Sequence, residues 1–353
     1  MTQRLKILTW HVHGNYLYYL SQVPHDFYLV TKPGHPPGYA GAVGSLPWGD
    51  NVHEVAADQL HQRDDFDLVL YQSHLHFNER QQMLSPAQLT LPAVFLEHDP
   101  PQQHPTATRH PASQVEHTHI VHCTPFNALM WDNGDAPVSV IEHGVMIPDG
   151  VHYTGKIEEG LVVVNNLRLR GRRLGADVFE HMRERLPLTL VGMDSQSLGG
   201  MGEIPNLELP AFMARYRFFF NPIRWTSLGL SVLEAMAVGL PIVGLATTEM
   251  STVIHNNQNG YLDTRPGRLV EVMRALLHDP ELARRWGAAA RQTAHERFGI
   301  DRFVRDWTTL FDAVAEGQSP ASLRHWSRWS NDPVRDARVK GPAPELAHAS
   351  VHA

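Results

Sequence analysis

Residues 218–246 read FFFNPIRWTSLGLSVLEAMAVGLPIVGLA and are the most informative part of the chain. The apolar run 218–220 predicts a buried strand, and a helical pattern follows over about 228–238. Gly239 ends that helix, and residues 240–245 predict a second buried strand. A strand, a helix and a strand in succession indicate a βαβ unit and therefore a parallel sheet.

The start of this helix is suited to an anion such as phosphate. Thr226 and Ser227 are N-cap types, and free backbone N–H groups and the positive end of the helix dipole collect there. Gly229 has no side chain, so a ligand can approach the backbone. Glu234 would repel a phosphate, and it suits neutral hydroxyls such as those of a ribose. The alternative is that Glu234 is a solvated helix glutamate.

The stretch resembles the donor-site signature of the retaining glycosyltransferases of family 4, which have the GT-B fold. The family pattern is Glu, seven residues, a second Glu, then Ala-Met-Ala, a Gly and Pro-Val-Val, and LEAMAVGLPIVG at 233–244 is similar to its second half. The resemblance implies that Glu234 holds the ribose. The first glutamate, which lies near the donor sugar in the family, falls on Thr226, so a carboxylate role does not carry over to that position.

The resemblance, which spans roughly residues 138–311, implies two Rossmann-like parallel-sheet domains that face a central cleft. We expect an acceptor-side domain over 1–149 and a nucleotide-sugar donor domain over 150–299. A helix over 300–316 should cross back to the first domain. The tail, 317–353, is predicted to be partly disordered because it is rich in Ser, Pro and Arg.

A cluster of arginines follows the Val-rich strand that is predicted over 160–165. In the family, cations of this loop grip the diphosphate. Here Asn165-Asn166 stands where the family has Gly-Arg, and Arg replaces the family's Lys. Arginine forks onto phosphate oxygens, so Arg168 and Arg173 are predicted to act on the diphosphate, with Arg172 next. The alternative is a set of solvated arginines.

Further donor contacts are predicted on both halves of the chain. Gly14 follows the first predicted strand, where the family often has a glycine pair, and a lone glycine is a weaker signal. Arg224 lies in the loop before the helix, close to where a base or sugar would lie. The rest of the predicted donor set is Thr226, Ser227, Leu228, Gly229 and Glu234.

His98 is the predicted catalytic residue of the first half. It follows a predicted strand over 91–96, and catalytic side chains in open α/β sheets lie at the carboxyl ends of strands. Members of the resembled family often carry a histidine at this point, near the reacting sugar. Glu97 and Asp99 could set the tautomer or the pKa of His98. The alternative is an ordinary loop histidine in a histidine-rich half.

The histidine pairs HVH at 11–13, HLH at 74–76 and HTHIVH at 117–122 raise the question of a metal site. On a strand, alternate residues share a face, so each pair could supply two ligands. No cysteine or carboxylate at zinc spacing accompanies them. Surface and interdomain histidines are therefore the preferred interpretation, and neither a metal nor a cofactor beyond the donor is expected.

Composition limits the function classes. The chain has 353 residues, enough for two domains, and one cysteine, Cys123, which fits a reducing compartment. No apolar run reaches the ~18 residues of a membrane span, so a cytoplasmic protein is expected. The net charge is −7, and residues 1–150 hold six Lys or Arg against fifteen Asp or Glu. This acidic half argues against nucleic-acid binding and against docking on anionic lipid.

The sequence therefore predicts a transferase that moves a hexose, with retention, from a nucleotide diphosphate sugar to a hydroxyl. The acceptor would be a sugar, a lipid-linked molecule or a small molecule. Two alternatives stay open: a nucleotide-sugar epimerase on the same fold, and a non-catalytic nucleotide-sugar-binding protein, which the threonine at 226 suggests. Base, sugar, acceptor and oligomeric state are not specified. Among local elements, residues 51–62 are predicted to be a helix and the Gly- and Pro-rich 32–50 a long loop.

Overall fold

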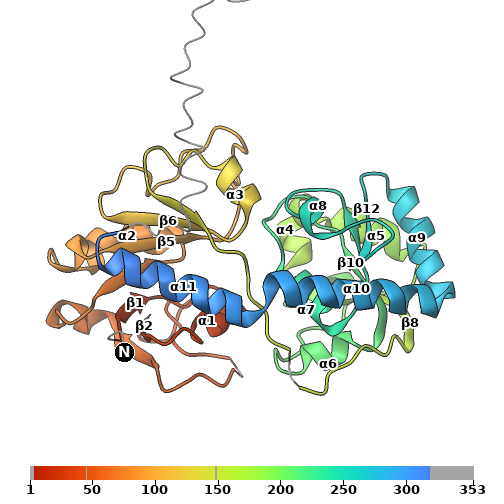
Figure 1. Ribbon diagram of the computed structural model, residues 1–353, viewed down its shortest axis with the longest axis horizontal. Helices are drawn as coiled ribbons and strands as arrows, with labels where there is room; N and C mark the ends of the chain where they lie inside the picture. The colour runs from red at the N-terminus through yellow and green to blue at the C-terminus, as the bar shows by residue number, and fades with distance from the viewer. Residues whose placement is uncertain (1–3, 45, 148, 319–353) are drawn as a thin grey trace, which may run out of the picture.

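The computed structural model describes residues 4–44, 46–147 and 149–318. Two parallel sheets form two domains that lie side by side (Figure 1). The first sheet has the order β3-β2-β1-β4-β5-β6-β7. Its strands are β1 (Lys6–Thr9), β2 (Asp26–Thr31), β3 (Val52–Ala56), β4 (Leu68–Tyr71), β5 (Ala93–Glu97), β6 (Thr118–His122) and β7 (Val138–Val140).

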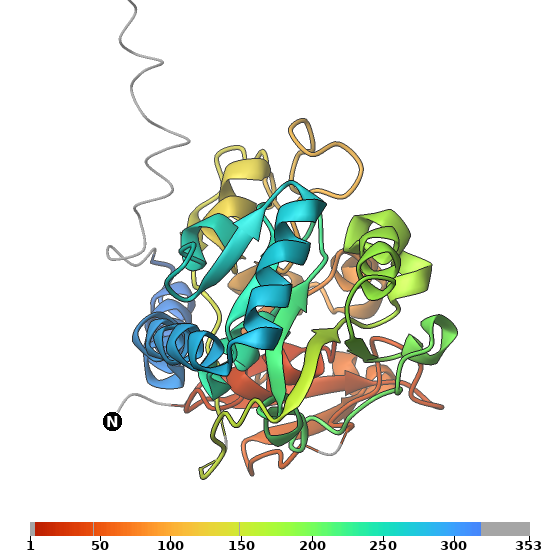
Figure 2. The ribbon, with the colours of Figure 1, turned by 90° about the vertical axis from the view of Figure 1, so that its right-hand side faces the viewer.

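The second sheet has the order β12-β11-β10-β8-β9, and all its pairings are parallel. In the view of Figure 2, helices flank this sheet. Its strands are β8 (Ile157–Val163), β9 (Leu188–Val191), β10 (Tyr216–Asn221), β11 (Ile242–Leu245) and β12 (Gly260–Asp263). The predicted strand-helix-strand unit is confirmed as β10, α7 (Leu230–Val238) and β11.

The remaining helices connect and cover the sheets. Those of the first domain are α1 (Gly14–Leu20), α2 (His74–Met83) and α3 (Pro125–Met130). Those of the second are α4 (Leu167–Leu174), α5 (Ala176–Arg183), α6 (Leu209–Met213), α8 (Met250–Val253), α9 (Pro266–His278) and α10 (Pro280–Phe298). The last helix, α11 (Ile300–Ala315), follows α10 and lies along the first domain, where it packs on α1 (Figure 1).

The core of the second domain shows why residues 218–246 dominate it. Side chains alternate across β10, so Phe219 packs on the α7 side, whereas Phe218 and Phe220 pack with residues of α5 and α9. All three rings are essentially buried, and each contributes about 1.5–3 kcal/mol of transfer free energy. The helix α7 is buried from Val232 to Val238, so it forms the centre of the domain rather than its surface.

Two local predictions are wrong. Residues 51–62 form strand β3 and then a short 3-10 helix (Ala57–Gln62), because β3 pairs in parallel with β2 and this pairing overrides the helical pattern. The HLH pair of 74–76 lies at the start of α2, not on a strand, and Ser73 caps this helix by accepting a hydrogen bond from the His76 N–H. The tail prediction falls almost wholly on residues 319–353, which lie outside the described residues.

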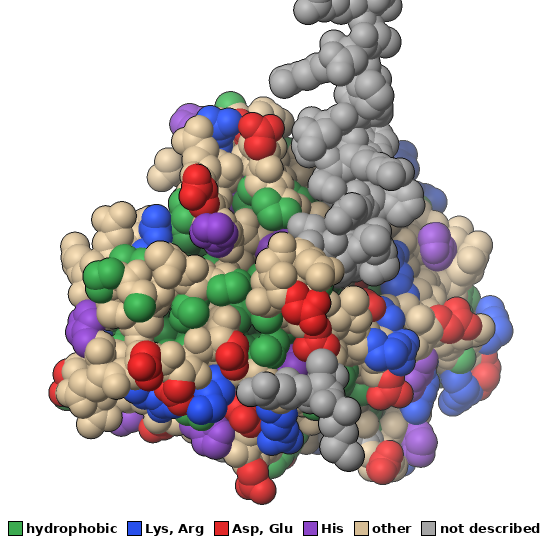
Figure 3. All heavy atoms as spheres, turned by 60° about the vertical axis from the view of Figure 1, so that its left-hand side comes forward, with side chains coloured by type: hydrophobic (Ala, Val, Ile, Leu, Met, Phe, Trp, Pro, Cys, Tyr) green, Lys and Arg blue, Asp and Glu red, His purple; other side chains and the backbone are tan. Residues whose placement is uncertain are grey.

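The outer side of the first domain carries a hydrophobic area bordered by charges of both signs (Figure 3). Lys and Arg side chains on this face lie among Asp and Glu side chains and form no continuous stripe in that view. The absence of nucleic-acid binding stays a prediction. Among the described helices, none combines the length and the apolar character that crossing a bilayer requires.

Candidate active site

A cleft of about 610 Å³ separates the two domains and is lined by both of them. This volume lies in the range of small-molecule sites. The first domain contributes loops that follow β1, β5 and β7, and the second contributes the ends of β8, β9 and β10 and the start of α7. Predicted residues that line the cleft are Gly14, His98, Thr226, Ser227, Leu228, Gly229 and Glu234.

The start of α7 faces this cleft. Gly229 is the N-cap residue with an extended backbone, and no side chain caps the helix. Leu228, Gly229, Leu230 and Ser231 all line the cleft. The first N–H groups of a helix have no partner within the helix, so they are available to an anion at this place.

Glu234 is buried, so the alternative of a solvated helix glutamate is excluded. Its Oε1 accepts hydrogen bonds from the Tyr19 hydroxyl at 2.8 Å and from Asn15 Nδ2 at 3.1 Å, both on α1 of the other domain. Burial raises the pKa of Glu234, and these two hydrogen bonds act in the opposite direction. No hydrogen bond among the described residues reaches Oε2, and the residue lines the cleft.

The arginines of residues 168–173 have different contacts in the structure. Arg168 is exposed and donates to the Ser197 carbonyl, and Arg172 pairs with Asp177 at 2.6 Å. Arg173 reaches across to Gln102 of the first domain. None of these three side chains lines the cleft as described, so their action on a diphosphate stays a prediction.

Arg170 is the arginine that lines the cleft, and the sequence analysis did not select it. Among the described residues, no side-chain hydrogen bond or ion pair engages its guanidinium. Burial lowers its pKa, and the neighbouring Arg173 acts in the same direction, whereas Asp99 opposes them. A half-buried cation without a protein partner is suited to an anionic ligand.

Two glycines shape this loop. Gly171 has φ 57° and ψ −136°, which interrupts α4 immediately after Arg170. Gly175 has φ 81°, and a Cβ there would lie 2.0 Å from the Pro222 carbonyl oxygen. Arg168 and Arg170 both precede this kink, and the family pattern from which Arg168 was predicted does not specify which of the two side chains faces the cleft.

Arg224 has a structural partner. Its guanidinium forms two hydrogen bonds with Asp177, at 2.6 and 2.9 Å, and donates to the Arg172 carbonyl. These contacts join the loop before α7 to the start of α5. A donor-binding role of Arg224 stays a prediction, and in this structure its charge is already paired.

The predicted catalytic histidine lies in an aromatic cluster. The ring of His98 contacts His13 and Tyr16 edge-to-face, with centroid distances of 4.3 and 4.8 Å. Burial lowers the pKa of His98 well below its usual value, and the nearby His13 adds to this. Its Nε2 is buried and has no hydrogen-bond partner among the described residues. His98 is therefore a neutral imidazole in the wall of the cleft.

His143 also lines the cleft, and burial lowers its pKa to about 4. Both of its ring nitrogens are buried without a hydrogen-bond partner in the described part of the chain. The region around the reacting position is thus rich in neutral histidines. His13, His98 and His143 come from loops after three different strands, and only the tertiary structure brings them together.

One cluster has the composition of a metal site. His74, Glu97 and His110 offer ligand atoms that all lie within 4.8 Å of one another. His74 Nε2 lies 2.7 Å and His110 Nε2 3.3 Å from Oε2 of Glu97. Burial would raise the pKa of Glu97, but the two histidines outweigh burial and lower it. A hydrogen bond that the His74 ring donates to the Glu97 carboxylate raises the pKa of His74.

The hydrogen-bond pattern of this cluster fits protons better than an ion. His110 Nδ1 accepts a hydrogen bond of 3.2 Å from the Ala112 N–H, so the ring hydrogen lies on Nε2, on the side of Glu97. A metal on Nε2 would move that hydrogen to Nδ1, against the Ala112 donor. Oε1 of Glu97 also accepts the Asp99 N–H at 3.0 Å. The cluster thus anchors the loop that carries His98.

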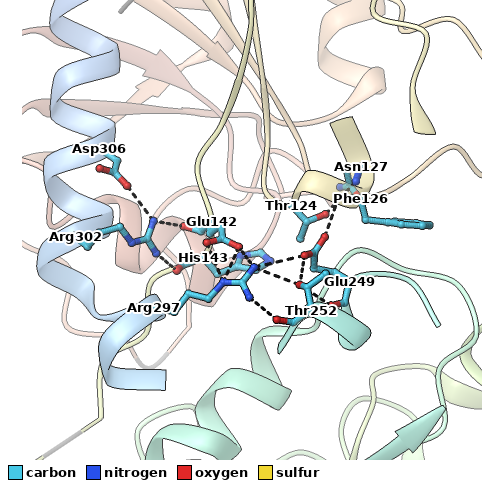
Figure 4. A network of polar contacts seen from close by, with 10 residues as sticks. All are labelled: Thr124, Phe126, Asn127, Glu142, His143, Glu249, Thr252, Arg297, Arg302 and Asp306. Atoms are coloured by element: carbon cyan, nitrogen blue, oxygen red, sulfur yellow. Dashed lines mark hydrogen bonds and ion pairs between the residues drawn. The ribbon is translucent and has the colours of Figure 1, made fainter. Parts of the chain in front are cut away.

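A second polar network joins the domains at the junction of α10 and α11 (Figure 4). Arg297 of α10 donates from Nε to both carboxylate oxygens of Glu142, each at 3.1 Å. The buried Glu249 accepts the Phe126 N–H at 2.8 Å from the first domain. Arg302 of α11 donates to the carbonyls of Glu142 and His143. These contacts connect the α10–α11 junction to the loop that carries His143.

Residues 198–293 match the family described as glycosyl transferases group 1. This segment contains β10, α7, β11 and β12. It therefore includes the helix start, the loop at 224–229 and Glu234.

Curated relatives are similar over part of the chain. The N-acetyl-alpha-D-glucosaminyl L-malate synthase of Bacillus anthracis is 35% identical over 89 residues, which are 24% of this chain and 23% of that protein. The sulfoquinovosyl transferase SQD2 of Arabidopsis thaliana is 30% identical over 132 residues, 36% of this chain and 24% of the relative. The chain spans about a quarter of the length of the curated relatives it matches.

Solved structures share the whole fold. Sucrose-phosphate synthase from Thermosynechococcus elongatus superposes with a TM-score of 0.65 at 15% identity, over 89% of this chain and 100% of that one. HepE of Anabaena, solved in complex with UDP, gives a TM-score of 0.62 at 13% identity, over 88% and 100%. The GT-B fold, with two parallel-sheet domains facing a cleft, is confirmed.

Proposed function

We propose that the protein is a retaining glycosyltransferase of family 4 that transfers a hexose from a nucleotide diphosphate sugar to an acceptor hydroxyl. The observation that carries the proposal is the cleft wall at 226–234, where an uncapped helix start and a buried carboxylate lie next to each other. The family match over 198–293 and the GT-B fold support it.

In this proposal each part of the donor has a counterpart in the cleft. The diphosphate lies between the start of α7 and Arg170, which together offer N–H groups and a cation. Oε2 of Glu234 accepts the ribose hydroxyls. The base lies toward the loop after β9, where Gly192, Met193 and Glu203 line the cleft. HepE of Anabaena, a structural relative, was solved with UDP and with UDP-glucose, which supports a UDP-sugar as the first donor to test.

The proposed chemistry takes place on one face of the sugar. The bond between the anomeric carbon and the phosphate oxygen breaks, and a bond to the acceptor oxygen forms on the same face. The acceptor proton passes to the leaving phosphate oxygen. Arg170 and the helix start stabilise the charge on that phosphate, and the neutral His98, which lines the cleft, orients the sugar or the acceptor. No metal ion and no cofactor enters this scheme, and a cytoplasmic location is part of the proposal.

The experiment is a panel of UDP-, GDP- and ADP-linked hexoses, assayed with and without simple sugar and polyol acceptors. Release of nucleotide together with a glycoside of retained anomeric configuration, measured by NMR, is expected. Isomerised sugar without nucleotide release would identify an epimerase. Binding without turnover would identify a binding protein, and no binding of any nucleotide would overturn the donor-site assignment.

A further inference from the structure

The loop after β5 places the carboxylate of Asp99 next to Thr226. Thr226 Oγ1 donates a hydrogen bond of 3.1 Å to Oδ1 of Asp99, although the two residues are 127 positions apart. Both line the cleft. We propose that Asp99 binds the hexose of the donor by accepting hydrogen bonds from its hydroxyls, so that the first domain supplies the carboxylate on this side of the cleft. This inference rests on the proposed function.

Asp99 is held rigidly on the backbone side. Its N–H donates to Glu97 Oε1 at 3.0 Å, and its carbonyl accepts the Trp131 Nε1–H at 2.9 Å. Pro100 and Pro101 follow and limit the backbone further. Because Glu97 is itself engaged with His74 and His110, the backbone that carries the Asp99 side chain is held by a network of polar contacts.

One oxygen of Asp99 is available to a ligand. Oδ1 accepts from Thr226, but no hydrogen bond or ion pair among the described residues reaches Oδ2. The side chain is half-buried. This oxygen is open to the cleft, and sugar hydroxyls are neutral donors that can replace water there. His98 is the preceding residue, so Asp99 lies beside the proposed reacting position.

The other carboxylates of the cleft are placed for other parts of the donor. Glu234 is bound to α1 through Oε1, and Glu203 lies in the loop after β9, toward the proposed base. Asp99 is the carboxylate on the His98 side among the described lining residues. A negative charge there favours a neutral hexose over an anionic sugar such as a uronic acid.

The test separates binding of the sugar from binding of the nucleotide. Dissociation constants for UDP and for UDP-glucose, and kcat/KM with the donor found in the panel, are measured for Asp99→Asn, a variant that keeps the volume and an acceptor for Thr226. We expect UDP binding within twofold of the wild type and a fall in kcat/KM of at least tenfold. The exposed Glu116→Gln is the matched control and should leave both quantities unchanged.

A double variant that moves the carboxylate from residue 99 to residue 226 provides a second test. Asp99→Ala should lose activity, and adding Thr226→Glu, which returns a carboxylate from the other domain, should restore part of kcat/KM. Unchanged kcat/KM in Asp99→Asn would overturn the inference. An equal loss of UDP and UDP-glucose affinity would show that Asp99 only joins the domains, which also overturns it. If the wild-type protein itself binds no nucleotide, the proposed function fails first, and this inference with it.

Discussion

The hydroxyl of Tyr19 and the carboxylate of Glu234 form a 2.8 Å hydrogen bond that joins the two domains at the cleft. Asn15 adds a second bond to the same oxygen, Oε1. The carboxylate is therefore fixed by the first domain while it lies on the central helix of the second. Any ligand that binds the other oxygen of Glu234 contacts a group whose position depends on both domains.

Replacing Glu234 by Ala is expected to weaken UDP binding by about 1–3 kcal/mol, because a hydrogen bond from ribose to a charged group is lost. Isothermal titration calorimetry measures the change. The exposed Glu296→Ala on α10 is the control and should bind as the wild type does. Unchanged UDP affinity in Glu234→Ala would remove this residue from the donor site.

Arg170→Ala is expected to weaken UDP binding by about 1.5–3 kcal/mol and to leave uridine binding unchanged, because the guanidinium contacts phosphate rather than the nucleoside. Arg168→Ala, with an exposed side chain bonded to the Ser197 carbonyl, is the comparison and should change UDP affinity by less than ~0.5 kcal/mol. If Arg168→Ala weakened UDP binding more than Arg170→Ala did, the kinked loop would have to rearrange when the donor binds.

His98→Ala is expected to lower kcat by about 10²-fold or more while UDP affinity stays near the wild-type value, since the imidazole is placed for the sugar or the acceptor and not for the nucleotide. Because burial lowers the pKa of His98, kcat should not follow a histidine titration between pH 6 and 8. His104→Ala, in an exposed loop, is the control. Full activity of the His98 variant would return it to the loop-histidine interpretation.

Treatment with EDTA followed by gel filtration is expected to leave transfer activity unchanged. Arg170 and the helix start neutralise the diphosphate in our proposal, and the tautomer of His110 favours a hydrogen-bonded cluster. Metal content by mass spectrometry accompanies the assay. Loss of activity that Zn²⁺ or Mg²⁺ restores, together with metal loss in His74→Ala, would place an ion in the His74–Glu97–His110 cluster.

The protein is expected to lose stability as the pH falls from about 6.5 toward 4. Burial lowers the pKa of His119 and of His122 to about 4. In this pH window the unfolded state binds protons at these two histidines and the folded state does not. The free energy of unfolding is therefore highest above the pKa of the unfolded state and falls on acidification. Each such group contributes a slope of about 1.4 kcal/mol per pH unit.

Urea titrations at pH 7.5, 6.5, 5.5 and 4.5 measure this slope. In the double variant His119→Gln and His122→Gln, the amide nitrogen replaces Nε2, which contacts Ser139 and Asn133 respectively. The slope should then fall by up to about 2.7 kcal/mol per pH unit. An identical slope in the double variant would show that other buried groups govern the acid transition.

The prediction from residues 218–246 held because its signals are local. Three consecutive phenylalanines, a helical pattern and a Gly-x-Pro stop fix a strand, a helix and a strand without help from distant residues. The cap predicted at Thr226 and Ser227 is wrong, because the helix begins at Leu230 with Gly229 as its N-cap residue. The helix at 51–62 failed because a short segment took its conformation from pairing with β2, and single-sequence patterns carry no information about a partner 20 or more residues away.

The sequence alone determined the βαβ unit, the anion-suited helix start and a glutamate about one turn into that helix, because these depend on residues within a few turns of one another. Tertiary structure decided which arginine faces the cleft, since the position of α4 beside the first domain, and not its sequence, selects Arg170. It also placed Asp99 beside Thr226, and His74 and His110 around Glu97. Strand order and domain packing bring these groups together, and spacing along the chain does not encode them.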